Sequence, residues 1–172
     1  MDQLSKKTDW EIIFRPHPQS YTADKKLLDY LSEKYKDAEN ITVDKSPDNI
    51  PSMLKADIMI SDFSSINFEF AFLFNKPIIY SLQDVNIDVY DLSTLGRKTW
   101  KDDAIKKIGT ELNSDNINDL VNVIQNTTEN KQANIQEIKD FAWQKQGEGA
   151  KNTVDFLVKK QAELSNNYGN SI

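Results

Sequence analysis

The sequence predicts an α/β fold, a Rossmann-like three-layer domain in which a mostly parallel sheet is covered by helices on both faces. Three observations predict it. Short apolar runs of strand length alternate with segments of helical periodicity along the 172 residues. Two of these runs are followed directly by a polar turn, at residues 15–18 and 61–65. The run at residues 66–74 is apolar nearly all round, which is typical of a buried helix.

The first half of the chain gives two strands and two helices. Residues 10–14 predict a strand that ends at Pro16, because proline cannot continue a central ladder. Apolar side chains recur at helical spacing over residues 22–36, and residues 41–43 predict the second strand. Turn residues then precede a short helix at residues 52–55.

The second half adds two strands and further helices. Residues 56–60 and 78–80 predict strands that flank the apolar helix. The stretch from residue 81 to residue 109 is interpreted as loop-rich. Three helices are expected after it, at residues 115–125, 131–144 and 149–164.

One domain over residues 10–165 is therefore expected. Residues 1–9 are polar, and we interpret them as disordered or as an addition to the natural protein. Residues 166–172 are expected to fray.

Composition excludes several classes of function. The net charge of −6 disfavours nucleic acid as a partner, because that needs a basic face. No cysteine and a single histidine leave no cysteine or multi-histidine metal site, so we expect no metal and no cofactor. None of the five glycines lies in a strand-to-helix turn, which excludes the dinucleotide fingerprint and the P-loop. No apolar run reaches 18 residues, and a cytoplasmic protein is expected.

The turn Ser61-Asp62-Phe63-Ser64-Ser65 is a candidate phosphate site. It presents hydroxyls at the start of the apolar helix, where backbone N–H groups lack partners and the macrodipole is positive. The alternative is simple helix capping by one of these side chains. The residues alone leave the two interpretations about even. Glu69, in the first turn or so of the helix, is either a dipole-favourable acid or an acceptor for sugar hydroxyls.

The motif Arg15-Pro16-His17-Pro18 is the second candidate. Two prolines stiffen the backbone around His17, and an arginine can grip a phosphate through two parallel hydrogen bonds. The alternative is a proline-rich surface turn with an arginine paired to an acid. Because ligands of parallel sheets bind beyond the carboxyl ends of the strands, both polar turns are expected on one rim.

These motifs, taken in order, resemble the CDP-glycerol glycerophosphotransferase family, the teichoic-acid polymerases and primases of bacterial envelopes and their capsule relatives. The resemblance rests on Phe14-Arg15-Pro16-His17-Pro18, on the run from residue 56 to residue 70, on Lys76-Pro77-Ile78-Ile79-Tyr80 and on Asp84. It implies the C-terminal, donor-binding half of a two-domain GT-B transferase.

The resemblance also implies roles for single residues. His17 corresponds to a catalytically important histidine near the donor diphosphate, with Arg15 beside it. The matching substrate-binding positions are Asp62, Ser64, Ser65, Glu69 and Asp84. The implied reaction is attack by an acceptor hydroxyl on the distal phosphorus of CDP-glycerol, with CMP as the leaving group.

The implied partners are CDP-glycerol or another nucleotide-diphosphate donor, a polymer acceptor of wall or capsule, and the N-terminal half of the enzyme. The family also has a central strand, which residues 1–9 are too short and polar to supply, and a second catalytic histidine in its N-terminal half, whereas this sequence holds only His17. We therefore expect a fragment that is inactive alone. The full enzyme is expected at the inner face of the plasma membrane as a peripheral protein. Two alternatives stay open: another GT-B transferase that uses a nucleotide sugar, and a non-catalytic module that binds phosphate or a partner protein.

Overall fold

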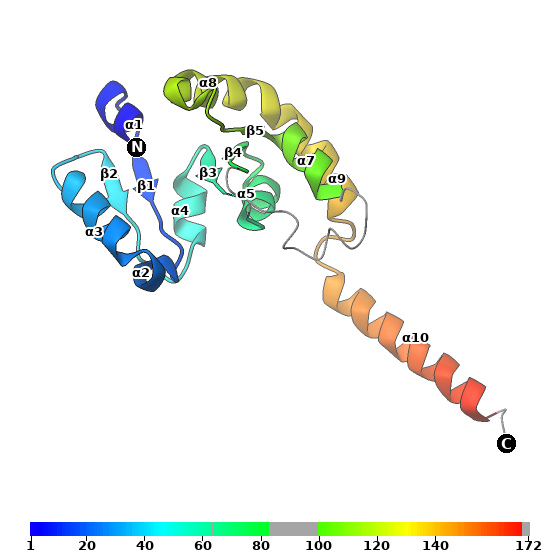
Figure 1. Cartoon of the computed structure of the whole chain (residues 1–172). Coiled ribbons are helices and arrows are strands. Elements are labelled where there is room, and N and C mark those ends of the chain that lie inside the picture. Colours follow the sequence, from blue (N-terminus) through cyan, green and yellow to red (C-terminus); the bar gives the residue numbers. More distant parts are fainter. Residues whose placement is uncertain (63, 83–99, 170–172) are drawn as a thin grey trace. The chain divides into compact units, whose positions relative to one another are not determined.

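The computed structural model describes residues 1–62, 64–82 and 100–169. These residues form two compact units, Met1–Ile138 and Lys139–Ile172, where the sequence predicts one domain over residues 10–165. The first unit alternates strands with helices (Figure 1). The elements in chain order are α1 (Asp2–Lys7), β1 (Ile12–Phe14), α2 (Ser20–Ala23), α3 (Lys25–Lys34), β2 (Ile41–Val43), α4 (Ile50–Lys55), β3 (Met59–Ser61), α5 (Ile66–Phe74), β4 (Ile78–Tyr80), α7 (Trp100–Ile108), β5 (Gly109–Glu111), η2 (Ile117–Asp119), α8 (Leu120–Lys131), η3 (Gln132–Asn134), α9 (Ile135–Ala142) and α10 (Gly149–Gly169).

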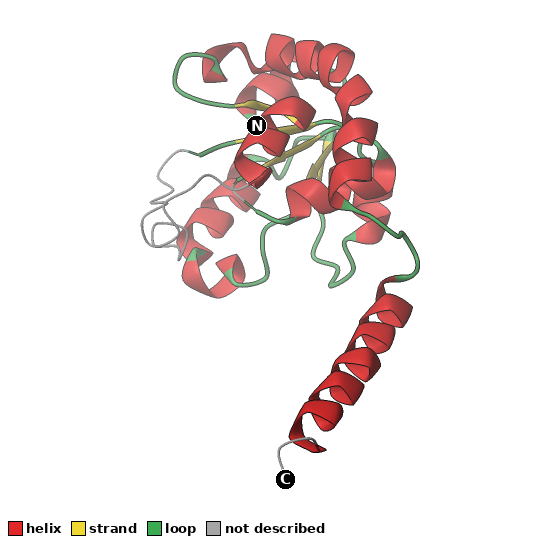
Figure 2. Cartoon of the chain, turned by 90° about the vertical axis from the view of Figure 1, so that its right-hand side faces the viewer, coloured by secondary structure: helices red, strands yellow, loops and turns green. Residues whose placement is uncertain are grey.

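All strand pairs in the described residues are parallel, which confirms the predicted α/β, Rossmann-like fold. β1 pairs with β2, so that Ile13 lies opposite Thr42. β3, β4 and β5 form a second sheet in that order. Helices lie on both sides of the strands (Figure 2). The carboxyl ends of parallel neighbours meet at one edge, and this edge carries the polar turns.

The helix α5 is a core element, as its sequence predicts. Phe70 and Ala71 are fully buried, and the rings of Phe68 and Phe72 pack with centroids 5.7 Å apart. The helix ends because Asn75 adopts a left-handed conformation (φ 53°), which asparagine tolerates better than most residues. β4 follows at once and is buried at all three positions.

The interpretation of residues 81–109 as loop-rich was wrong at its C-terminal end. Residues 100–108 form α7, and β5 follows directly. Ala104, Ile105 and Ile108 share the buried face of α7. The first turn of α7 carries aspartates and its last turn carries lysines, which matches the helix dipole. This helical spacing was present in the sequence and was overlooked.

The helix expected at residues 115–125 begins later than predicted. Asn116 closes a turn by accepting a hydrogen bond from the Asn113 N–H (2.9 Å) and donating to the carbonyl of Glu111 (2.8 Å). These asparagine bonds compete with helical ones. α8 therefore starts at Leu120, with Asp119 as the residue before it.

The N-terminal residues Asp2–Lys7 form α1, which is tied to the rest of the first unit. Asp2 in α1 accepts hydrogen bonds from Lys34 (2.7 Å) and Tyr35 (2.9 Å). Leu4 is buried. The side-chain amide of Gln3 donates to the carbonyl of Ile117 and accepts from the N–H of Leu120. At the other end of the chain, α10 continues to Gly169.

One apolar cluster joins the two sheets of the first unit. Its buried members are Leu4, Ile79, Leu120 and Ile124. Ile12 of β1 and Trp10, which precedes that strand, pack against it from one side, and Leu112 packs against it from the end of the second sheet. α1 and α8 therefore pack both sheets into the same compact unit, and the space between the sheets lies within that unit.

We expect Gly109→Ala to destabilise the first unit. An added Cβ would lie 2.5 Å from a side-chain carbon of Ile78 and 2.7 Å from its carbonyl oxygen, so β4 and β5 must separate. Overpacking of this kind costs about 1–3 kcal/mol. Urea unfolding followed by circular dichroism measures it. Gly149→Ala is the matched control, because an added Cβ there meets nothing within 4 Å. An unchanged midpoint for Gly109→Ala would show that β5 is not packed as described.

Candidate functional site

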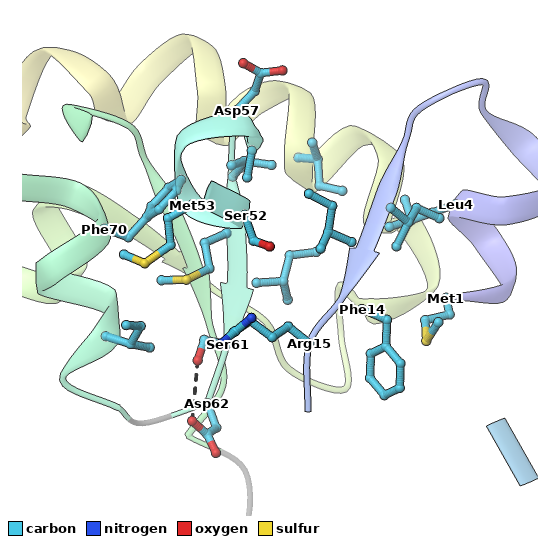
Figure 3. Close-up of a pocket in the computed structure, with 18 of the residues that line it drawn as sticks. Met1, Leu4, Phe14, Arg15, Ser52, Met53, Asp57, Ser61, Asp62 and Phe70 are labelled. Atoms are coloured by element: carbon cyan, nitrogen blue, oxygen red, sulfur yellow. Dashed lines mark hydrogen bonds between the residues drawn. The ribbon is translucent and has the colours of Figure 1, made fainter. Parts of the chain in front are cut away.

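A large cleft opens between β1 and β3, with a volume of about 2150 Å³. In Figure 3 the two strands flank it, with Arg15 at the end of one strand and Ser61 and Asp62 at the end of the other. Small-molecule sites usually measure about 300–1,000 Å³. The cleft is therefore larger than a nucleotide alone would need.

The cleft brings together the two polar turns that the sequence singles out. His17 and Ser64 both line it. Six of the seven predicted site residues are among its lining residues, namely Arg15, His17, Asp62, Ser64, Ser65 and Glu69. The seventh, Asp84, lies outside the described residues.

Arg15 is held by acceptors from the loop after β2. Its guanidinium donates to Asp44 (2.5 Å) and to the carbonyl of Ser46. The Arg15 and Asp44 side chains are only 23% and 18% exposed, so water screens the pair less than a surface ion pair. The second interpretation of this motif, in which the arginine pairs with an acid, is therefore correct for Arg15. The remaining N–H donors of the guanidinium stay available to a ligand in the cleft.

Asp44 is the residue that fixes this corner. The hydroxyl of Ser52, the N–H of Ser46 and the guanidinium of Arg15 hold the pKa of the Asp44 carboxyl below its ordinary value of 3.8, against the opposing effect of burial. Asp44 is thus ionised at neutral pH. Its negative charge partly offsets the positive charge of Arg15. Its hydrogen bond also fixes the position of the guanidinium.

His17 is exposed and stiffly held. The backbone N–H of Gln19 donates to Nδ1 of His17 (3.2 Å), and the N–H of Ser20 donates to its carbonyl (2.9 Å). An Nδ1 that accepts a hydrogen bond assigns the proton of the neutral ring to Nε2. His17 therefore presents a donor at Nε2, which suits a phosphate oxygen.

The serine turn is built by local hydrogen bonds. The Nδ2 amide of Asn67 donates to the carbonyl of Asp62 (2.8 Å), which fixes the turn from inside the core. Ser64 Oγ accepts from the N–H of Ile66 at 3.4 Å. Within the described residues, the hydroxyl of Ser65 makes no capping bond to α5. Among the described residues, the hydroxyl of Ser65 at the cleft is therefore not used for capping.

The first N–H groups of α5 are hydrogen-bonded, whereas the sequence analysis predicts unpaired ones. The N–H groups of Asn67 and Phe68 donate to the carbonyls of Ser64 (3.3 Å) and Ser65 (3.1 Å). A ligand at this helix end is therefore met by serine hydroxyls and by the positive end of the dipole, rather than by a row of unpaired N–H groups.

Two exposed carboxylates complete the rim. Asp62 and Glu69 both face water and line the cleft. A carboxylate repels phosphate but accepts hydrogen bonds from hydroxyl groups. The site thus offers donors at His17, Arg15 and Ser65 for an anion, and acceptors at Asp62 and Glu69 for a polyol or a ribose.

Sequence reasoning missed the residues that support this site. Asp44 and Asn67 belong to no sequence motif. Their supporting roles become visible only from the hydrogen bonds that they make in the structure. Tyr80 and Glu111 lie in register with Ser61 at the ends of β4 and β5. Burial, together with the charge of Glu111, raises the pKa of Tyr80 to about 12, so its hydroxyl stays protonated at neutral pH.

Two searches bear on cofactors and membranes. Within residues 1–62, 64–82 and 100–169, no three histidine, cysteine, aspartate or glutamate side chains gather as a metal site would require. Over the same ranges, no helix combines the length and the apolar character needed to cross a membrane.

We expect Asp44→Asn to lower the free energy of unfolding at pH 7, because it leaves Arg15 partly buried without its anion. The folded-state pKa of Asp44 is lowered, so its contribution is complete above pH 3.8 and disappears as the pH falls through the folded value. The difference between wild type and variant should therefore shrink in acid. Urea unfolding at pH 7 and pH 3 measures it.

The control is Asp29→Asn, which alters an exposed ion pair with Lys25 on α3 and should change little at either pH. Equal stability of wild type and Asp44→Asn at pH 7 would contradict a structural role for the Arg15–Asp44 pair.

One of three comparisons with known proteins gives a match. The model of the CDP-Glycerol:Poly(glycerophosphate) glycerophosphotransferase family matches residues 3–158. No curated protein and no solved structure matches the chain. The family match covers both polar turns, all the cleft-lining residues except Met1 and Asp2, and the first half of α10 up to residue 158. The chain therefore belongs to the CDP-glycerol:poly(glycerophosphate) glycerophosphotransferase family.

Proposed function

We propose that this chain is the donor-binding half of a transferase that moves glycerol phosphate from CDP-glycerol to a wall or capsule polymer. Membership of the family makes it a domain of the glycerophosphotransferase type. The observation that carries the finer proposal is that His17 and Ser64, from turns 47 residues apart in sequence, line one cleft. A diphosphate is the part of the donor that both turns can contact at once.

The phosphates of the donor bind between the two turns. Ser64 and Ser65 supply hydroxyls on one side, and the dipole of α5 adds positive potential there. His17 Nε2–H and the free donors of Arg15 supply the other side. Hydrogen bonds to ionised phosphate oxygens are about twice as strong as neutral ones.

The reaction follows from this placement. An acceptor hydroxyl oxygen attacks the phosphorus that carries glycerol, and a new P–O bond forms. The bond from that phosphorus to the bridging oxygen breaks, and CMP leaves with the bond's electron pair. Negative charge grows on the bridging and non-bridging oxygens, where His17 and Arg15 stabilise it. The proton of the acceptor hydroxyl passes to solvent as the new bond forms.

The carboxylates set the orientation of the donor. Asp62 and Glu69 accept hydrogen bonds from hydroxyls of the ribose or of the glycerol. Asp84 belongs to the same proposal on the basis of sequence alone. The acceptor polymer and the N-terminal half of a GT-B enzyme approach the open side of the cleft, at the inner face of the plasma membrane.

We expect CDP-glycerol to raise the melting temperature of the purified chain. Ligand at 100 times its Kd stabilises the folded state by about 2.7 kcal/mol, a rise of roughly 5–10 °C for a chain of this size. Differential scanning fluorimetry measures it, with CDP, UDP-glucose and GDP-mannose in parallel. A larger rise with a nucleotide sugar would assign the site to a sugar transferase. No rise with any nucleotide, in a folded chain, would favour a partner-binding module and overturn the proposal.

We also expect Ser65→Ala to weaken CDP-glycerol binding by about tenfold or more, since a hydrogen bond to a charged group contributes roughly 1.5 kcal/mol or more. The hydroxyl of Ser65 makes no capping bond within the described residues, so the fold should be unaffected. Isothermal titration calorimetry measures the Kd. The control is Ser32→Ala, an exposed serine of α3 away from the cleft. Equal affinities for wild type and Ser65→Ala would remove the serine turn from the donor site.

A further inference from the structure

The short helix α4 forms part of the wall of the cleft. Ser52 and Met53 line the cleft (Figure 3), and Met53 is only 5% exposed. The helix has six residues. An isolated helix shorter than about 12 residues is marginal in water. The position of α4 therefore depends on the contacts that its two ends make with the rest of the first unit.

The first turn of α4 is tied to the corner that holds Arg15. The hydroxyl of Ser52 donates a hydrogen bond to Oδ2 of Asp44, eight residues earlier in the chain. The guanidinium of Arg15 donates to the same oxygen. Asp44 is thus shared between the helix and the guanidinium. A movement of the first turn of α4 would therefore change the position of Asp44 and, with it, that of Arg15.

The last turn of α4 is tied to Lys76. The ammonium group of Lys76 donates to the carbonyls of Leu54 (3.1 Å) and Ala56 (2.6 Å). Carbonyls at the end of a helix lack intrahelical partners and lie at the negative end of the dipole, so they suit a cation. The side chain of Lys76 is only 25% exposed. Asp57, 4.0 Å away and 96% exposed, adds little.

Lys76 is itself fixed relative to the serine turn. That turn leads into α5, and Asn75 ends α5 in a left-handed conformation one residue before Lys76. Phe70 and Ala71 of α5 are fully buried, and close-packed cores of this kind do not deform continuously. The serine turn and Lys76 are therefore held at the two ends of one rigid element.

These contacts make a continuous path from one polar turn to the other. The path runs from the serine turn through α5 to Lys76, and from Lys76 to the last turn of α4. It continues from Ser52 in the first turn of α4 through Asp44 to Arg15. Every link is a hydrogen bond or a helix. The path therefore fixes how far Arg15 lies from the serine turn.

We propose that α4 is a rigid link that sets the spacing of the two polar turns, and that Lys76 is the positioning residue that holds this link in place. Lys76 does not line the cleft, so it acts through Ser52 and Asp44 rather than on a ligand. The inference rests on the proposed function, in which both turns hold one diphosphate. A displacement of about 1 Å between groups that serve one ligand is enough to reduce function strongly.

The pKa of Asp44 reports whether the first turn of α4 is in place. The hydroxyl of Ser52 is the largest of the influences that hold the pKa of the Asp44 carboxyl below 3.8, ahead of the N–H of Ser46 and the guanidinium of Arg15. The charge that contributes is that of Arg15. A change in this pKa on substitution of Lys76 would therefore be transmitted through α4. A lysine that only caps the helix would leave it unchanged.

The test is Lys76→Met, which removes the donors of the side chain and keeps most of its length. The full chain, labelled with ¹³C at its aspartate carboxyl carbons, is titrated with acid and followed by NMR. The pKa of Asp44 should rise toward 3.8 in the variant, because Ser52 is no longer held beside it. The matched control is Lys131→Met. Lys131 also donates to a carbonyl at the end of a helix, that of Lys106 in α7 (2.9 Å), and lies outside the cleft lining, so this variant should titrate as wild type does.

Ser52→Ala separates transmission through α4 from a direct effect of the lysine charge. It should raise the pKa of Asp44 by itself, because it removes the hydroxyl. Addition of Lys76→Met to Ser52→Ala should then produce no further rise. Coupling is reciprocal, so Ser52→Ala should also change the NMR shift of the Lys76 side chain. That last measurement decides the matter if Lys76→Met does not fold.

The consequence for the ligand is measured by titration calorimetry with CDP-glycerol. Lys76→Met should weaken binding by about threefold or more, although Lys76 does not touch the cleft. Lys131→Met should bind with the Kd of wild type.

Several results would overturn the proposal. One is an unchanged pKa of Asp44 in Lys76→Met, or an unchanged Lys76 signal in Ser52→Ala. Another is a further rise of the same size when Lys76→Met is added to Ser52→Ala, since the charge would then act directly. A third is a raised pKa with an unchanged Kd for CDP-glycerol, which would make Lys76 a structural cap alone. A wild-type chain that binds no nucleotide would instead remove the proposed function, and the titration of Asp44 would still decide whether α4 is a rigid link.

Discussion

The shared direction of β1 and β3 is the constraint on which the candidate site depends. The two strands belong to separate sheets and point toward the same end, so the polar turns that follow them line the same cleft (Figure 3). If they ran in opposite directions, one of the two turns would lie at the other end of the cleft. This shared direction also explains why residues far apart in sequence, such as His17 and Ser64, line one cleft.

The rim is fixed by groups that do not themselves meet a ligand. Asp44, held by Ser52 and Ser46, sets the position of Arg15. Asn67 ties the serine turn to α5 from within the core. Supports of this kind hold the candidate binding groups in place in the absence of a ligand, which would lower the entropy lost on binding. Their removal is expected to weaken binding through geometry rather than through a lost ligand contact.

Local signals in the sequence predicted much of this arrangement. The apolar runs at residues 41–43 and 78–80 gave strands with the predicted bounds, and the apolar segment after the serine turn gave a buried helix. The helix α7 was missed although its spacing was visible. The contacts of Asp2 and Leu4 and the pairing of Arg15 with Asp44 could not be predicted, because they depend on residues 29 to 120 positions away. The division into two open-edged sheets likewise appears only when the strands are placed.

The central claim is that the two polar turns clasp one diphosphate. Titration of isotopically labelled chain with CDP-glycerol, followed by the NMR shifts of the backbone amides, tests it most directly. The account predicts that the amides around His17 and those around Ser64 and Ser65 shift together along one binding curve with a single Kd. Shifts confined to one turn, or two curves with different Kd values, would contradict it.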